Sequence, residues 1–175
     1  MGMHEIALVC VLALEGHDSL DVAKSYTCIG VVYYRQGQYE RALENHQKGL
    51  EIFIKVSGQD HPDVATSLMN VGNVLEAMGK YEEALVQHQK SLDIKIRVFG
   101  GDHPDVAVSI KNIGIVYHNK GDRAAAAEMC TKAYHIFLKV LGPHHPETQG
   151  LKPFVPSVPA IVAGGVPETG KRDGH

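Results

Sequence analysis

The chain has 175 residues, of which 44% are hydrophobic and 6% aromatic, and its formal net charge is −3. The hydrophobic share is sufficient for a sizeable core, whereas the weak negative charge gives no indication of a nucleic-acid partner or a membrane surface. Three cysteines at positions 10, 28 and 130 show no paired spacing. They are expected to be free thiols in a reducing compartment, so the sequence favours a soluble cytoplasmic protein. The apolar run at residues 6–14 is too short to cross a bilayer.

One segment recurs along the chain with a period of 42 residues. The sequence His-Pro-Asp-Val-Ala at 61–65 returns at 103–107, and His-Pro-Glu at 145–147 begins in the same place of the next unit. Residues 39–43 and 81–85 repeat in the same way, and His4, His46 and His88 follow the same period. A fixed period of this size is typical of stacked helical repeats.

Each repeat is predicted to contain two helices joined by a tight turn. In the first unit, Val22, Tyr26, Ile29 and Tyr33 are spaced by four, three and four residues, as on one face of a helix. A break at residues 37–38 separates this helix from a second one at 39–56. The next two units give helices at about 62–78, 81–99, 104–119 and 123–141 in the same order. No stretch alternates like a strand, so the sequence predicts an all-α fold.

The repeat boundaries divide the chain into three parts. Residues 1–16 are predicted to be a half-repeat helix without its partner, and residues 17–150 to hold three repeats and the start of a fourth. Residues 151–175 contain four prolines and are expected to form a disordered tail. The aspartates at 60 and 102, which precede His61-Pro62 and His103-Pro104, are expected to cap the following helices.

Small residues recur where the two helices of a unit are expected to cross. Each interior glycine costs about 1 kcal/mol in helix propensity, so a repeated glycine needs a compensating close approach. We expect each glycine of the first helix to face an alanine of the second. The pairs are Gly30 with Ala42, Gly72 with Ala84, and Gly114 with Ala126.

These patterns resemble the tetratricopeptide repeat, whose signature is W-x₂-L-G-x₂-Y followed by A-x₃-F. The first unit has Tyr26-x₂-Ile29-Gly30-x₂-Tyr33 and Ala42-x₃-His46, and the other units follow the same frame. Each unit is about eight residues longer than the usual repeat of roughly 34 residues. Eight residues lengthen a helix by ~12 Å, so the second helix of each pair should be unusually long.

The 42-residue form, with Gly-x-Asp-His-Pro-Asp-Val-Ala between units, resembles the repeats of kinesin light chain. That resemblance implies a right-handed superhelix (an α-solenoid). It also implies a concave groove, lined by the first helices, that binds short extended peptides partly through a Leu-Asn-Asn-Leu-Ala segment. Here residues 68–72 are Leu-Met-Asn-Val-Gly and residues 110–114 are Ile-Lys-Asn-Ile-Gly, so the second asparagine is kept twice. The coiled coil by which light chains join a motor has no counterpart in the sequence.

The candidate groove residues are those of the first helices that do not face the second helix of their own pair. Amide and apolar side chains along such a face suit an extended peptide, because an asparagine can both donate to and accept from its backbone. A solvated polar face explains the same residues almost equally well. The candidates are Thr27, Val31, Tyr34, Met69, Asn70, Asn73, Glu76, Lys111, Asn112, Ile115 and His118.

No pattern indicates catalysis, a metal site or a cofactor. Most of the 11 histidines follow the repeat, and the adjacent His144 and His145 have no cysteine or acidic cluster at zinc spacing. The segment from Gly165 to Lys171 imitates a phosphate loop, but Arg172 takes the place of its Ser or Thr. The sequence therefore favours a non-catalytic module with a protein or peptide partner. The alternative is a structural piece that self-associates as a homo-oligomer through uncapped ends.

Overall fold

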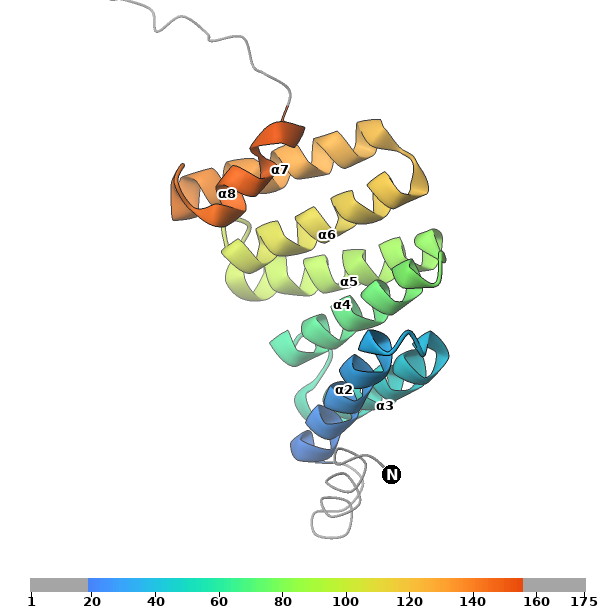
Figure 1. Cartoon of the computed structure of the whole chain (residues 1–175). Helices are drawn as coiled ribbons and strands as arrows, with labels where there is room; N and C mark the ends of the chain where they lie inside the picture. Colours follow the sequence, from blue (N-terminus) through green and yellow to red (C-terminus); the bar gives the residue numbers. More distant parts are fainter. Residues whose placement is uncertain (1–18, 156–175) are drawn as a thin grey trace, which may run out of the picture.

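The computed structural model describes residues 19–155, which form a stack of antiparallel helix pairs (Figure 1). The pairs are α2 (Leu20–Arg35) with α3 (Tyr39–Ser57), α4 (Pro62–Ala77) with α5 (Tyr81–Phe99), and α6 (Pro104–Lys120) with α7 (Arg123–Leu141). A short helix α8 (Pro146–Leu151) and a 3₁₀ turn η1 (Lys152–Phe154) follow. No strand occurs within residues 19–155, and the fold is an all-α repeat solenoid, as predicted.

The second helix of each pair is the longer one. Helices α3, α5 and α7 each have 19 residues, whereas α2 and α4 have 16 and α6 has 17. This confirms the expectation drawn from the unusual repeat length. Successive pairs pack through α3 against α4 and α5 against α6, so the hydrophobic core runs along the whole stack.

The starts of α4 and α6 are capped by histidine, which corrects the expected role of the preceding aspartate. The Nδ1 atom of His61 accepts a hydrogen bond from the backbone N–H of Asp63 at 3.2 Å, and His103 does the same for Asp105 at 3.1 Å. Asp60 is occupied elsewhere, because both its contacts at 2.6 and 3.1 Å are with the guanidinium of Arg97. The aspartate therefore ties one repeat to the next across the loop.

In the first two pairs the nearest neighbours of the interior glycine are the atoms of a histidine ring and not the expected alanine. A Cβ atom on Gly30 would lie 2.7 Å from the ring of His46, and one on Gly72 would lie 2.8 Å from the ring of His88. In the third pair, a Cβ atom on Gly114 would lie 3.2 Å from Met129, 3.3 Å from Cys130 and 3.4 Å from the backbone oxygen of Ala126, the alanine expected there. Each glycine makes room for a buried side chain of the second helix.

The chain remains folded past residue 150. Leu151 is 5% exposed and packs in a cluster with Phe137, although both it and η1 fall in the segment expected to be a disordered tail. The rest of that tail, residues 156–175, and the predicted half-repeat at residues 1–16 lie outside the described residues. Within residues 19–155, no helix is long and apolar enough to span a membrane.

Candidate functional site

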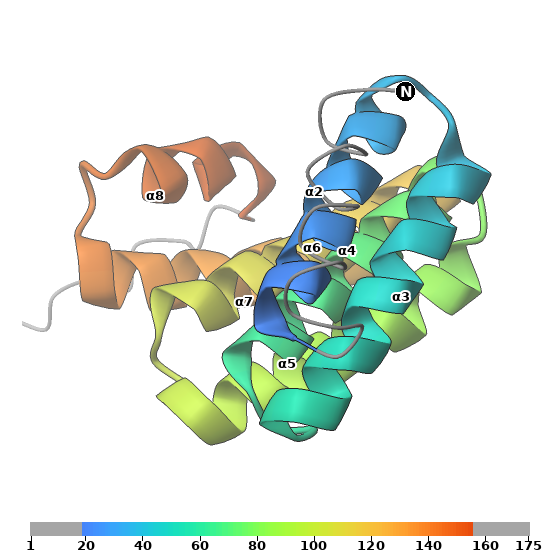
Figure 2. The ribbon, with the colours of Figure 1, turned by 90° about the horizontal axis from the view of Figure 1, so that it is seen from below.

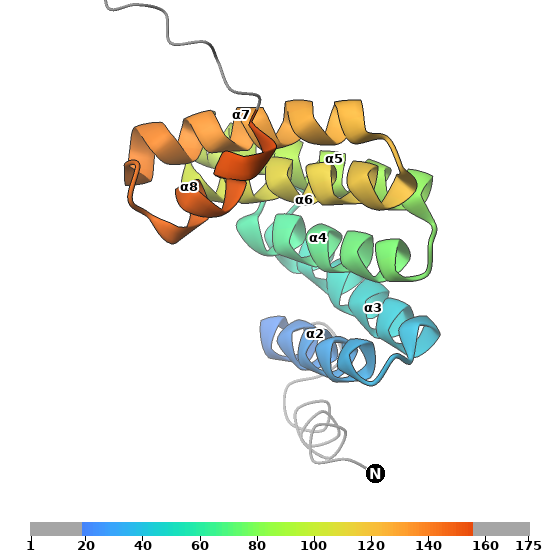
Figure 3. The ribbon, with the colours of Figure 1, turned by 45° about the horizontal axis from the view of Figure 1, so that its top comes forward.

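The first helices α2, α4 and α6 follow one another along the array, and α8 lies at the end opposite to α2 and α3 (Figures 2 and 3). Side-chain interactions link neighbouring first helices directly. The Nδ2 atom of Asn119 on α6 donates to Glu76 on α4 at 2.6 Å. Burial raises the pKa of Glu76, which the hydrogen bond from Asn119 partly offsets. Burial and the nearby carboxylate of Glu76 raise the pKa of Tyr34 on α2. Glu76 therefore lies close to all three helices.

The predicted groove residues of α2 are only partly available to a partner. Thr27 is half-buried, and its hydroxyl donates to the carbonyl oxygen of Ala23 at 3.1 Å, within its own helix. Val31 is half-buried, and Tyr34 as a whole residue is 38% exposed. This end of the face offers mainly apolar and aromatic surface.

Two equivalent asparagines on α4 and α6 have amides without partners. Asn70 and Asn112 are half-buried, and neither side chain forms a hydrogen bond to another residue within the described part of the chain. Met69 and Asn73 on α4 are half-buried beside Asn70. An amide in this setting has two donors and an acceptor ready for a bound backbone.

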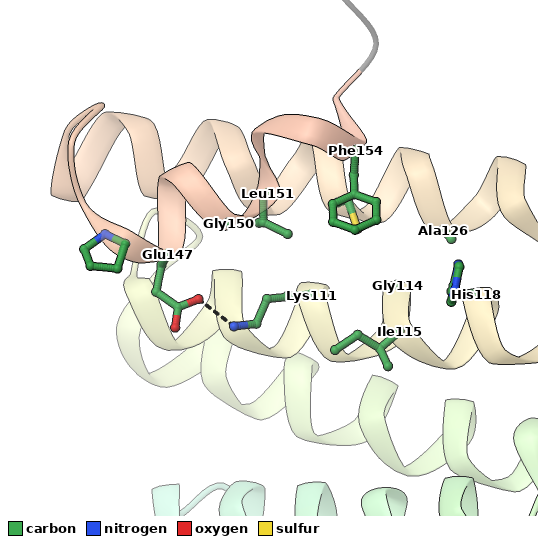
Figure 4. Close-up of a pocket in the computed structure, with 11 residues that line it drawn as sticks. Lys111, Gly114, Ile115, His118, Ala126, Glu147, Gly150, Leu151 and Phe154 are labelled. Atoms are coloured by element: carbon green, nitrogen blue, oxygen red, sulfur yellow. Dashed lines mark hydrogen bonds and ion pairs between the residues drawn. The ribbon is translucent and has the colours of Figure 1, made fainter.

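Three of the four predicted residues of α6, all except Asn112, line a pocket of about 450 Å³ (Figure 4). Lys111, Ile115 and His118 line one side of it, and Cys130 of α7 lies on another. Lys111 is held at one edge by an ion pair of 2.5 Å with Glu147 of α8. The centre of the pocket is apolar, and the charge of Lys111 at its rim is neutralised by Glu147.

Side chains from the end of the chain form the rest of this pocket. Leu151 of α8 and Phe154 of η1 reach down toward Ile115 (Figure 4). Burial raises the pKa of the Cys130 thiol, so this sulfur contributes a neutral, apolar surface. Such an arrangement suits an apolar side chain better than a charged one. Within residues 19–155, no group of three His, Cys, Asp or Glu side chains could hold a metal ion.

The tetratricopeptide repeat model matches residues 21–95 and 63–139, which together cover most of the described chain. The chain belongs to the tetratricopeptide repeat family. A search of curated proteins finds no match.

Solved structures place this tetratricopeptide repeat protein beside kinesin-light-chain-like arrays. BtubC (BKLC) from P. vanneervenii has 25% identity and a TM-score of 0.73, over 82% of this chain and 57% of that one. A putative kinesin light chain from Podosopora anserina has 19% identity and a TM-score of 0.73, over 87% and 72%. The apo form of RapI has 24% identity and a TM-score of 0.71, over 85% and 51%. This chain thus spans little more than half of BtubC, and the similarity to the other two shows the fold alone.

The pocket lies beside the short helix α8, which follows α7 in the place of a further first helix. Helix α8 has 6 residues where α6 has 17, because Pro153 cannot continue the helix. Where α6 covers α4, Glu76 is half-buried, whereas the equivalent His118 is exposed and Ile115 is 42% exposed. Sequence reasoning missed Cys130, Leu151 and Phe154 as site residues. The signal that could have revealed them is Pro153 soon after a repeat start.

Proposed function

We propose that this protein is a non-catalytic interaction module that binds an extended segment of a partner protein across α2, α4 and α6. The tetratricopeptide repeat fold supports the general role of a scaffold for protein interactions. The observation that carries the finer proposal is that the amides of Asn70 and Asn112 have no hydrogen-bond partner among residues 19–155. They occupy equivalent places one repeat apart, so both can bond to the backbone of one extended peptide.

The pocket at the end of this face supplies an anchor for the same segment. Its centre is apolar and its rim carries the Lys111–Glu147 pair, so a bulky apolar side chain of the partner would be buried there. Aromatic and aliphatic anchors in such pockets carry much of the binding energy of protein interfaces. The amides then fix the direction of the backbone, and the pocket fixes its position.

The test uses immobilised protein and a library of random nine-residue peptides, from which bound peptides are recovered and their affinities measured. Each neutral hydrogen bond contributes a net ~0.5–1.5 kcal/mol, so changing both Asn70 and Asn112 to Ala should weaken binding roughly tenfold. The melting temperature should hardly change. The matched control is Asn45→Ala, because Asn45 lies on α3 and its amide bonds to the carbonyl oxygen of Arg41.

Two results would contradict this proposal. One is a library from which the protein captures no peptide. The other is a stable double variant that binds the recovered peptides as tightly as the original protein does.

Self-association through the end of the array is a second candidate function. It is favoured by the exposed apolar surface beside α8, where Ile115 is 42% and Phe154 53% exposed. Sedimentation velocity over a wide concentration range tests it. Association that is abolished by Ile115→Asp supports assembly through this end, and a single monomeric species at every concentration contradicts it.

A further inference from the structure

A carboxylate stands on the groove face of the second repeat where the first and third repeats have a tyrosine and a histidine. Tyr34, Glu76 and His118 are separated by one period each, and they belong to α2, α4 and α6. The repeat therefore has no need of an acid at this position. Glu76 is half-buried, and taking a carboxylate out of water is costly unless its charge is paired. An acid at a position where the neighbouring repeats do without one indicates a role other than stability.

The carboxylate of Glu76 has one hydrogen bond and no cationic partner. Its Oε1 atom accepts from the amide of Asn119 at 2.6 Å, and its Oε2 atom accepts no hydrogen bond from any of residues 19–155. Lys120, the residue after Asn119, pairs instead with Glu82 of α5 at 2.8 Å. Burial raises the pKa of Glu76, and only the neutral amide of Asn119 opposes that effect. Asn119 therefore orients the carboxylate and leaves its charge unpaired.

The ring of Tyr34 lies beside this carboxylate on the neighbouring first helix. Burial and the charge of Glu76 raise the pKa of the Tyr34 phenol, so the two groups are near enough to interact across α2 and α4. Tyr34 is 38% exposed, and the centre of its ring lies 5.8 Å from that of Tyr39, with 55° between the ring planes. An aromatic surface and an unpaired acid therefore lie side by side on the groove face.

Cations already lie over two other tyrosines of α2. The guanidinium of Arg41 lies 5.5 Å from the centre of the Tyr33 ring, and the Nζ atom of Lys48 lies 5.8 Å from the centre of the Tyr26 ring. No cation of residues 19–155 lies over the ring of Tyr34. A cation that reached this ring would be attracted both by the ring face and by the adjacent carboxylate.

We propose that Glu76 and Tyr34 form a specificity site for a lysine or arginine side chain of the bound partner segment. This inference rests on the proposed binding of an extended segment and adds the chemistry of one of its positions. The basic group binds Oε2 of Glu76 and lies over the Tyr34 ring, while Asn119 keeps its bond to Oε1. Asn70 is six residues before Glu76, ~9 Å along α4, so one nine-residue segment can reach both. Charge-assisted hydrogen bonds are stronger than neutral ones, so the site disfavours a neutral analogue of the same shape.

The experiment compares the peptides that variants recover from the random nine-residue library. Glu76→Gln removes the charge at nearly the same shape and keeps an oxygen for Asn119, and Tyr34→Leu removes the ring. The matched control is Glu51→Gln, which removes the same charge from an exposed position of α3. The original protein and the control should enrich Lys and Arg at one peptide position about threefold or more over Gln and Met. Glu76→Gln should lose that enrichment and Tyr34→Leu should reduce it, while both variants melt no earlier and keep total capture within about twofold.

A single recovered basic peptide then gives the coupling directly. Its neutral analogue, with citrulline for arginine or acetyl-lysine for lysine, should bind the original protein about tenfold more weakly. The two peptides should bind Glu76→Gln equally well.

The possible failures separate this inference from the proposed function. Capture without a basic preference, a preference that persists in Glu76→Gln, or one that Glu51→Gln also loses overturns the role of Glu76 and leaves groove binding intact. An enrichment unchanged by Tyr34→Leu overturns the role of the ring. Failure of the original protein to capture any peptide overturns the proposed function and this inference together.

Discussion

The two buried histidines at the helix crossings should make the fold sensitive to mild acid. His46 is 2% and His88 1% exposed, and each ring lies against a glycine of the facing helix. The Nδ1 atom of His46 and both ring nitrogens of His88 have no hydrogen-bond partner. Burial lowers the pKa of both rings from 6.5 to about 4, and the charge of Lys95 adds to the effect at His88.

The direction of the effect follows from which state takes up protons. Below pH 6.5 the unfolded chain protonates both histidines, whereas the folded chain keeps them neutral until about pH 4. The stabilisation is therefore complete above pH 6.5 and is lost as the pH falls toward 4. Each histidine loses ~1.4 kcal/mol per pH unit in this interval, so the pair should lose about 3 kcal/mol between pH 7.5 and pH 5.5.

Urea unfolding followed by far-ultraviolet circular dichroism at these two pH values measures the loss. The comparison protein changes both His46 and His88 to Cys, the residue at position 130 in the third repeat. All other titrating groups are common to the two proteins. The original protein should lose about 3 kcal/mol more than the double variant does. Equal losses would show that the rings are protonated in the folded state at pH 5.5, and the reasoning from burial would be refuted.

Two packing predictions follow from the same helix contacts. Gly72→Ala should destabilise the fold by ~1–3 kcal/mol, because the new Cβ would meet the His88 ring at 2.8 Å, whereas Gly101→Ala has nothing within 4 Å and should change the urea midpoint little. Leu151→Ala should lower the unfolding free energy by ~2 kcal/mol or more, while Phe154→Ala, at an exposed side chain, should have a smaller effect in the same assay. A midpoint unchanged by Leu151→Ala would mean that α8 contributes nothing to the stability of the array.

The repeat period was enough to predict the helix pairs and their lengths. Helix boundaries depend on local features, namely a His-Pro start and a glycine of positive φ after α3, α5 and α7. Such features repeat with the sequence, so one correctly assigned unit determines the others. The groove candidates follow from the same helical periodicity, which places Met69 and Asn70 away from the apolar face of α4. The contacts of these residues could not be predicted, because a helical periodicity assigns a residue to a face of the helix and does not say which residue it touches.

The incorrect predictions concern positions where two residue types could meet the same structural requirement. Asp60 and His61 can both cap α4, and the outcome depends on Arg97, which is 37 residues away and binds the aspartate. Likewise a glycine predicts close approach, but the size of the approaching group depends on the neighbouring helix. The repeat pattern includes His46, but it does not predict that a polar ring fills a buried site without hydrogen-bond partners.

The pocket and the buried side chain of Lys95 depend on departures from the repeat. When one repeat has a different residue at a buried position, the equivalent residues of the neighbouring repeats show which side chain packing alone would favour there. Phe53 and Phe137 stand one period before and after Lys95, and they indicate that packing favours a ring at this position. Cys130 differs from Lys95 in this respect. It takes the position of His46 and His88 in the third repeat and puts another neutral group in place of a buried ring. A change that removes an unsatisfied polar group is explained by stability, whereas Lys95 buries an ionisable group that packing alone would not choose.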